Sequence, residues 1–272
     1  DYAGVADLVN TLSVDSTYRG GPDRLLPPAP YSYSALQSVR DDVFYAASNG
    51  LDANRDQWQD NTLLKDGLSS ILRSDFDRMV GEATAPNGAG FDDEHPFPKA
   101  LENFAQNVLF TDPTGGSRDA TSQFLVDKLS TMINDVNTLN DADFAAKYDG
   151  SNQAQITHLA GAILGHIDNG LEQATQVASD KHEAEKKGLE FGLGLAWALG
   201  QDGLKLLPGG NVLATVLPDS ITGSETFGAI KGELISKMQE GLNDEAAELL
   251  LKEYPDLHAD GVLSGLTQEL SE

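Results

Sequence analysis

Apolar residues recur every three or four positions along most of this 272-residue chain, and no long stretch alternates between polar and apolar residues. Such spacing places apolar side chains on one face of a helix, which other helices must then cover. The two clearest stripes consist of Leu64, Leu68, Leu72, Phe76 and Met79, and of Ile156, Leu159, Ile163, Ile167, Leu171 and Ala174. The sequence therefore predicts an all-α fold, a multi-helix bundle.

Capping residues predict where several of these helices begin. Asn61 or Thr62 is placed to cap the helix that carries the first stripe, because either side-chain oxygen can accept a hydrogen bond from the first turn. Asn140 can cap a short helix in the same way. The long helix with the second stripe is expected to open at Ser151.

Glycine and proline predict where helices stop. The pair Asn49-Gly50 is expected to end a helix that begins near Ser34. Long loops are expected at 17–32 and 84–98, where proline fixes φ and removes a backbone donor. A further helix is expected from 99 to 110, after the second loop.

A third stripe has the heptad-like spacing 4, 3, 4, 3, which is typical of a seam between two helices. Its members are Leu125, Leu129, Met132, Val136 and Leu139. The stripe is too short for a long coiled coil. It predicts one more helix that packs against a neighbour.

The most apolar region, residues 185–219, contains a stripe of small residues at intervals of four. The stripe consists of Gly188, Gly192, Ala196 and Gly200. Small side chains let another helix approach closely, which compensates for the roughly 1 kcal/mol that an interior glycine costs relative to alanine. We expect this helix to be buried at the centre of the bundle, with Gly161 and Gly165 of the preceding long helix against it.

The same region is too interrupted to cross a membrane as one helix. A spanning helix needs about 20 consecutive apolar residues, whereas Asp202 and Lys205 break the run and Pro208 would lie at mid-depth. The sequence therefore argues against a membrane span. The alternative is a helical hairpin at 188–217 that is sheltered until triggered, which would make the chain a pore-forming or membrane-inserting domain.

Acidic residues outnumber basic residues by 43 to 18, which gives a formal net charge of −25. Binding of nucleic acids or anionic lipids requires clustered cations, and here the lysines and arginines are spread along the chain. The charge thus argues against both kinds of partner. The absence of cysteine excludes disulfides and thiol catalysis. The plain interpretation of this acidity is solubility, and a high-salt or extracellular setting is the other, with the cytoplasm as the alternative location.

Two acidic segments are the candidates for metal binding. One contains Asp52, Asn54 and Asp56, and the other contains Asp92, Asp93 and Glu94. The first begins like a calcium loop, but Gln57 and Leu63 stand where an EF-hand requires glycine and glutamate. The second could hold a hard cation loosely, and a solvated acidic loop is the competing interpretation. The sequence predicts no cofactor.

Catalytic signatures are absent from the sequence. There is no H-E-x-x-H pair, no nucleophile elbow of the form G-x-S-x-G and no phosphate-binding loop. No catalytic residue is therefore predicted. A hydrolase whose carboxylates are gathered by the fold stays as a further alternative, because such pairs come from distant positions.

The order of segments from 151 to 239 resembles a known kind of helical region. A long helix that ends in "DKHEAEKKG" is followed by the small-residue helix, then "LLPGGNVL", then an amphipathic helix with "GAIKGELISKMQ". This order is similar to the C-terminal helical region of large actinobacterial proteins, some of which carry a WXG-type hairpin and are associated with type VII secretion. The W-x-G motif is absent here, since Gln59 and Asp60 follow Trp58. The resemblance implies a secreted or cell-surface interaction domain without catalytic residues.

These patterns predict one helical domain over 1–272. The alternative is a division near Asp149-Gly150 into an N-terminal helical lobe, 1–149, and a C-terminal bundle, 150–272. The expected function is a non-enzymatic helical protein-interaction domain of a larger, exported bacterial protein, with another protein as its partner.

Overall fold

A computed structural model describes residues 33–53, 61–86, 90–92, 94–110, 117–148 and 150–177, with isolated positions at 8–9 and between 184 and 252. Within these ranges the chain is helical, and its one β-type pairing is an isolated antiparallel bridge between Thr84 and Phe91. The prediction of an all-α fold is confirmed.

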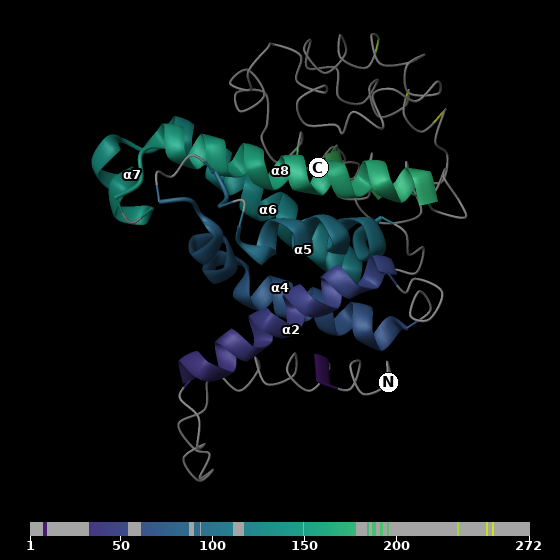
Figure 1. Ribbon diagram of the computed structural model, residues 1–272. Coiled ribbons are helices and arrows are strands. Elements are labelled where there is room, and N and C mark those ends of the chain that lie inside the picture. The colour runs from purple at the N-terminus through teal and green to yellow at the C-terminus, as the bar shows by residue number, and fades with distance from the viewer. Residues whose placement is uncertain are drawn as a thin grey trace, which may run out of the picture.

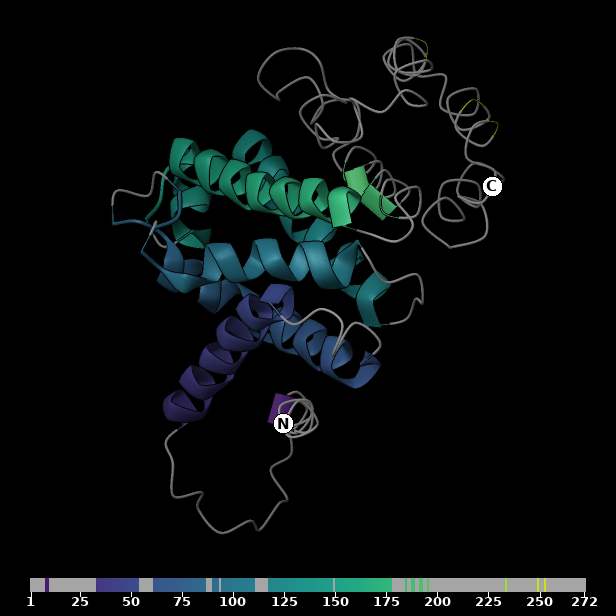
Figure 2. The ribbon, with the colours of Figure 1, turned by 45° about the vertical axis from the view of Figure 1, so that its right-hand side comes forward.

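The described residues form six α-helices and one π-helical turn. In chain order they are α2 (Tyr33–Ala53), α4 (Thr62–Ala83), α5 (Pro96–Phe104), the π-helical turn η2 (Ala105–Leu109), α6 (Ser117–Thr138), α7 (Asp141–Lys147) and α8 (Gln153–Val177). Helix α5 lies between α2 and α8 and continues directly into η2, while α6 packs against both α4 and α8 (Figures 1 and 2).

The two predicted stripes form much of the core. All five stripe residues of α4 and all six of α8 are buried. The caps of two predicted helices are also confirmed. Asn61 Oδ1 accepts from the Leu64 amide at 3.1 Å, and Asn140 Oδ1 accepts from the Ala142 and Asp143 amides.

Three helix ends differ from the sequence-based expectation, and the smallest difference is that α8 begins at Gln153 rather than at Ser151. Helix α2 continues through Asn49 and Gly50 to Ala53, because Leu51 is buried in the core and the Asn49 side chain is hydrogen-bonded to α5. Helix α5 begins at Pro96 rather than at residue 99. Proline suits the first turn of a helix, whose backbone N–H groups have no intrahelical acceptor.

The aromatic core is centred on Phe97, at the start of α5. Its ring centroid lies 5.7–6.5 Å from those of Phe44, Tyr45, Phe76 and Phe91. These rings come from α2, α4 and the segment before α5, so Phe97 joins three parts of the chain. Most of the pairs are edge-on, the arrangement that aromatic quadrupoles favour.

Helices α8 and α5 approach each other closely at Gly170 of α8. A Cβ at this position would lie 2.5 Å from the carbonyl oxygen of Glu102 and 2.7 Å from Cβ of Ala105. Both contacts are at the junction of α5 and η2. There the Phe110 amide donates to the Ala105 carbonyl at 3.1 Å, which is the wider i to i+5 bond of a π-helical turn. Only glycine fits this contact without displacing backbone.

The sequence placed the close approach at other glycines of the same helix. Gly161 and Gly165 are exposed, and a Cβ at either would have no described atom within 4 Å. Their exposure does not support the prediction that they receive the small-residue helix. The spacing of glycines shows only where close approach is sterically allowed. Within the described residues, α5 and η2 lie against Gly170 and not against Gly161 or Gly165.

The small-residue region is buried at the few positions that the structure describes. Gly188, Phe191, Gly192 and Leu195 are buried, and the Phe191 ring packs edge-on against Phe110 at 6.2 Å. These positions agree with a buried helix. The remainder of the region, including Ala196 and Gly200, lies outside the described residues.

The described helices on both sides of Gly150 share one hydrophobic core. Gly150 has a φ of +83°, a left-handed conformation that turns the chain from α7 into α8. Helix α8 then packs against α5, η2 and α6. Within the described ranges, Gly150 therefore lies between helices that pack on one core, and the division of the whole chain into lobes stays a prediction.

We expect Gly170→Ala to lower the free energy of unfolding by about 1–3 kcal/mol, because the added methyl group meets the Glu102 backbone. Gly165→Ala is the matched control on the same helix. It adds a methyl group in open space and should stabilise the protein by about 0.4–1 kcal/mol. Urea unfolding of both variants tests this. Equal effects at the two positions would contradict the close approach.

Candidate functional site

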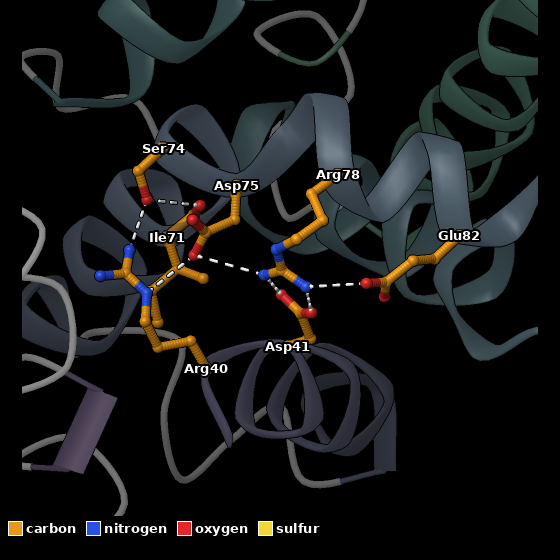
Figure 3. A network of polar contacts seen from close by, with 7 residues as sticks. All are labelled: Arg40, Asp41, Ile71, Ser74, Asp75, Arg78 and Glu82. Atoms are coloured by element: carbon orange, nitrogen blue, oxygen red, sulfur yellow. Dashed lines mark hydrogen bonds and ion pairs between the residues drawn. The ribbon is translucent and has the colours of Figure 1, made fainter. Parts of the chain in front are cut away.

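A network of charged side chains joins α2 to α4 (Figure 3). Arg40 Nε donates to Asp75 Oδ2 at 2.7 Å, and both residues are buried. Arg40 also donates to the Ser74 hydroxyl. Alongside this pair, both terminal nitrogens of Arg78 donate to the two carboxylate oxygens of Asp41. The four charged groups thus form two parallel ion pairs across one interface.

The position of this network follows from the helical period of α2. Arg40 and Asp41 lie one turn before Phe44 and Tyr45, so charged and aromatic residues share the face of α2 that meets the bundle. Burial raises the pKa of Asp41, against the hydrogen bonds from Arg78. Those same bonds raise the pKa of Arg78, so the guanidinium stays charged. The network orients α2 on α4.

A second polar cluster surrounds the carboxylate of Glu102, between α5 and α8. Oε1 accepts from Lys99 at 2.5 Å and from Gln173 at 2.6 Å, and Oε2 lies 3.4 Å from Nδ1 of His166. Burial alone would raise the pKa of Glu102, but these partners outweigh it and lower the pKa below its ordinary value. Glu102 is therefore an anion with both oxygens engaged.

The pairing of Glu102 with His166 resembles one half of a hydrolase site, in which a carboxylate orients a histidine base. The His166 ring also lies 5.8 Å from that of Phe91. The cluster fastens α8 to α5.

Three amide side chains are buried around the junction of α5 and η2. Asn103 Nδ2 donates to Asn49 Oδ1 at 2.9 Å, which ties α5 to α2, and Asn107 Nδ2 donates to the Asn103 carbonyl at 2.9 Å. Gln106 is buried beside them. Sequence reasoning missed this group, because the spacing of apolar residues in "NFAQNVLF" is that of an ordinary helix.

The predicted metal-binding segments do not form a metal site within the described residues. In those ranges no group of three or more histidines and carboxylates is placed to hold an ion. Asp92 instead shapes the turn before α5, where its Oδ1 accepts from the Glu94 amide at 3.0 Å. Asp52 lies in the last turn of α2. The other three candidates, Asn54, Asp56 and Asp93, lie outside the described residues.

None of the helices in the described ranges combines the length and the apolar character that a bilayer span requires. Most of the hairpin alternative at 188–217 lies outside these ranges.

The predicted seam of α6 is buried along only half of its length. Leu125 and Leu129 are fully buried, whereas Met132, Val136 and Leu139 are half-buried. From about residue 130 the seam packs against the edge of the core. Beyond that point its apolar side chains keep part of their surface in contact with solvent.

Helix α7 is fixed against this end of α6 by a compact cluster around Asp135. The Tyr148 hydroxyl and Lys147 Nζ both contact Asp135 Oδ2, each at 2.5 Å. Burial, and then the hydrogen bond to Asp135, raise the pKa of Tyr148, so the phenol stays protonated. The Phe144 ring packs on Tyr148 at 4.7 Å and is itself buried.

Comparison of the chain with protein-family models, with curated proteins and with solved structures gives no match. The resemblance to helical regions associated with type VII secretion therefore stays an expectation from the sequence.

We expect Arg40→Ala to destabilise the fold by about 3–5 kcal/mol, because it removes the guanidinium that lies 2.7 Å from the buried Asp75 carboxylate and leaves that of Arg78 at 3.9 Å. Lys128→Ala is the control, since the pair of Lys128 with Asp77 is largely exposed and should contribute no more than about 1 kcal/mol. Replacing both buried partners, with Arg40→Met and Asp75→Leu, should restore much of the loss. Urea unfolding measures the free energy of unfolding of each variant. A decrease in the double variant as large as that in Arg40→Ala would contradict this account.

The contribution of Glu102 to stability should depend on pH. Its folded-state pKa lies below the ordinary value of 4.5. The ionised carboxylate therefore stabilises the fold above about pH 4.5, and this stabilisation is lost as the pH falls through the lower folded-state pKa. The difference in unfolding free energy between wild type and Glu102→Gln should be constant around neutral pH and should shrink below about pH 4.5. A difference that stays constant down to pH 3 would contradict the prediction.

Proposed function

We propose that this chain is a non-enzymatic helical protein-interaction domain that binds a partner with a basic surface. Five basic side chains of the described helices are held in ion pairs with the protein's own carboxylates: Arg40, Arg78, Lys99, Lys128 and Lys147. This internal neutralisation of the cations is the observation that carries the proposal. Each pair also uses a carboxylate, so the excess of acid, a net charge of −25, is unchanged and few cations are left to oppose it.

Exposed carboxylates are present on several of the described helices, on Asp42 of α2, Asp127 of α6, Asp141 and Asp143 of α7 and Glu172 of α8. An acidic surface attracts a basic partner and accelerates its association. It repels nucleic acids and anionic membranes. This charge distribution favours protein binding.

The proposal includes a setting, an exported bacterial protein of which this chain is one region. The setting rests on the order of segments between 151 and 239 and on the acidic composition. It carries no claim about a particular residue.

Site-specific photo-cross-linking in the producing cells tests the proposed function. A photoreactive residue at Val39, Thr131 or Glu172 samples the exposed faces of three helices. We expect a discrete adduct from at least one position. The purified partner should bind with an affinity that falls at least tenfold between about 0.1 M and 1 M salt, because the screening length shortens from about 10 Å to 3 Å. No adduct at any position, or binding that is insensitive to salt, would contradict the proposal.

Vesicle leakage separates the interaction domain from the pore-forming alternative. We expect no release of trapped dye from anionic or neutral vesicles at neutral pH or at about pH 4, where carboxylates begin to lose their charge. Detergent supplies the complete-release control. Dye release that depends on acid pH and on the intact segment 188–217 would favour the hidden hairpin over protein binding.

A further inference from the structure

We propose that the carboxylates of Asp42 and Glu82, together with the hydroxyl of Tyr45, form a binding site for an ammonium group, the end of a lysine side chain of the basic partner. This ammonium site comprises Asp42 and Tyr45 of α2 and Glu82 of α4. The inference rests on the proposed function and specifies which residues engage the partner and which chemical group they bind.

The hydroxyl of Tyr45 is the one group of the site that the packing of the core does not require. The side chain is 7% exposed, and its ring packs edge-on against those of Phe44, His95 and Phe97. The hydroxyl oxygen is enclosed and has no hydrogen-bond partner among the described residues. Such a hydroxyl costs free energy, and phenylalanine would make the same ring contacts without this cost. The hydroxyl is therefore suited to a group that binds from outside.

The Tyr45 side chain reaches toward the charged interface of α2 and α4. Side chains of a helix lean toward its N-terminus, so Tyr45 covers the turn that contains Asp41 and Asp42. Burial raises the pKa of Tyr45. The carboxylates of Asp41, Glu82 and Asp42 raise this pKa further, against the guanidinium of Arg78. The hydroxyl therefore lies in the negative field of carboxylates from both helices.

Two of these three carboxylates are open to a ligand. Asp41 is buried, and both of its oxygens accept from Arg78. Asp42 is exposed, and the Glu82 side chain is 51% exposed, with Oε1 at 3.3 Å from Arg78 (Figure 3). Two arginines face three carboxylates in the network of Figure 3, and Asp42 adds a further negative charge next to Asp41. A bound cation would oppose this local excess.

The arrangement of the oxygens selects an ammonium group. An ammonium has three donors on one compact charge, and carboxylate and phenol oxygens can accept from all of them. A guanidinium is planar and matches the paired oxygens of one carboxylate, whereas the oxygens of the ammonium site belong to three side chains. A divalent metal is less suited, because no three histidines or carboxylates in the described part of the chain are placed to hold one.

The site needs only a local movement to admit a lysine. Tyr45 lies directly beneath the surface, since a small part of its side chain is exposed. Interface side chains commonly change rotamer on binding while the backbone stays in place. A small rotation of the exposed Glu82 side chain or of Tyr45 would bring the hydroxyl oxygen to the ligand. The methylene stem of the lysine can remain on the surface while its charged end is bound.

A synthetic peptide of lysines separated by serine and glycine, with both ends neutral, probes the site. The same peptide with acetylated lysines lacks the charge, and the peptide with arginines keeps the charge in a planar group. Fluorescence anisotropy with the full chain at about 0.1 M salt measures the affinities. We expect the lysine peptide to bind about tenfold more tightly than the acetylated peptide and about threefold more tightly than the arginine peptide.

Matched substitutions place the binding at the ammonium site. Tyr45→Phe removes one oxygen and keeps the packed ring, so it should weaken lysine-peptide binding about threefold or more without lowering the urea midpoint. Tyr148→Phe is the control, because this hydroxyl is already bonded to Asp135. It should lower the urea midpoint and leave binding unchanged. Glu82→Gln should weaken lysine-peptide binding about threefold more than Glu172→Gln, which removes an exposed charge from α8.

The outcomes separate the ammonium site from the proposed function. Unchanged affinity in Tyr45→Phe would overturn the site and assign an ordered water to the hydroxyl. Equal effects of Glu82→Gln and Glu172→Gln would overturn it too, because the attraction would then come from the net charge of the whole chain. Equal affinity for the lysine and arginine peptides would overturn the choice of an ammonium group. All three results leave an acidic, protein-binding domain.

Failure of both cationic peptides to bind at low salt would instead contradict the proposed function. Circular dichroism verifies that each variant is folded. If Tyr45→Phe does not fold, the comparison of Glu82→Gln with Glu172→Gln decides the test.

Discussion

The contact of α8 with the junction of α5 and η2 determines how the described helices fit together. Gly170 lets the α8 backbone approach the Glu102 carbonyl more closely than any other residue would allow. Since His166 and Gln173 lie one turn before and about one turn after Gly170, the same contact brings both side chains onto the Glu102 carboxylate. One steric fit thus places a buried anion and its partners. Through Phe97 the position of α5 in turn fixes α2 and α4.

Charged groups have two separate roles in this protein. Inside, Arg40 and Arg78 neutralise Asp75 and Asp41 across the α2–α4 interface. These pairs fix the orientation of the two helices more than they add to stability, because buried ion pairs seldom stabilise a fold more than apolar contacts would. Outside, the carboxylates exceed the cations that remain. The surface is acidic because carboxylates outnumber lysines and arginines along the chain, and each ion pair removes one of each. The basic partner that we propose follows from this excess.

Single helices could be predicted from this sequence, whereas the contacts between them could not. The stripes of α4 and α8 and the caps at Asn61 and Asn140 depend on residues a few positions apart, and the structure confirms them. The ion pair of Arg40 with Asp75 joins residues 35 positions apart, and no local pattern reveals it. The glycines of α8 show the difference best. Spacing marked Gly161 and Gly165 as suited to close packing, but only the path of the neighbouring backbone decides that Gly170 is used.

Helix α6 shows how one apolar stripe can pack at two depths. Leu125 and Leu129 are fully buried, whereas Met132, Ile133, Val136 and Leu139 pack against the edge of the core with part of their surface exposed. The contacts of Tyr148 and Lys147 with Asp135 hold α7 against this edge of the bundle. The spacing of apolar residues is therefore regular along α6, while the depth of burial depends on which helices lie beside each turn.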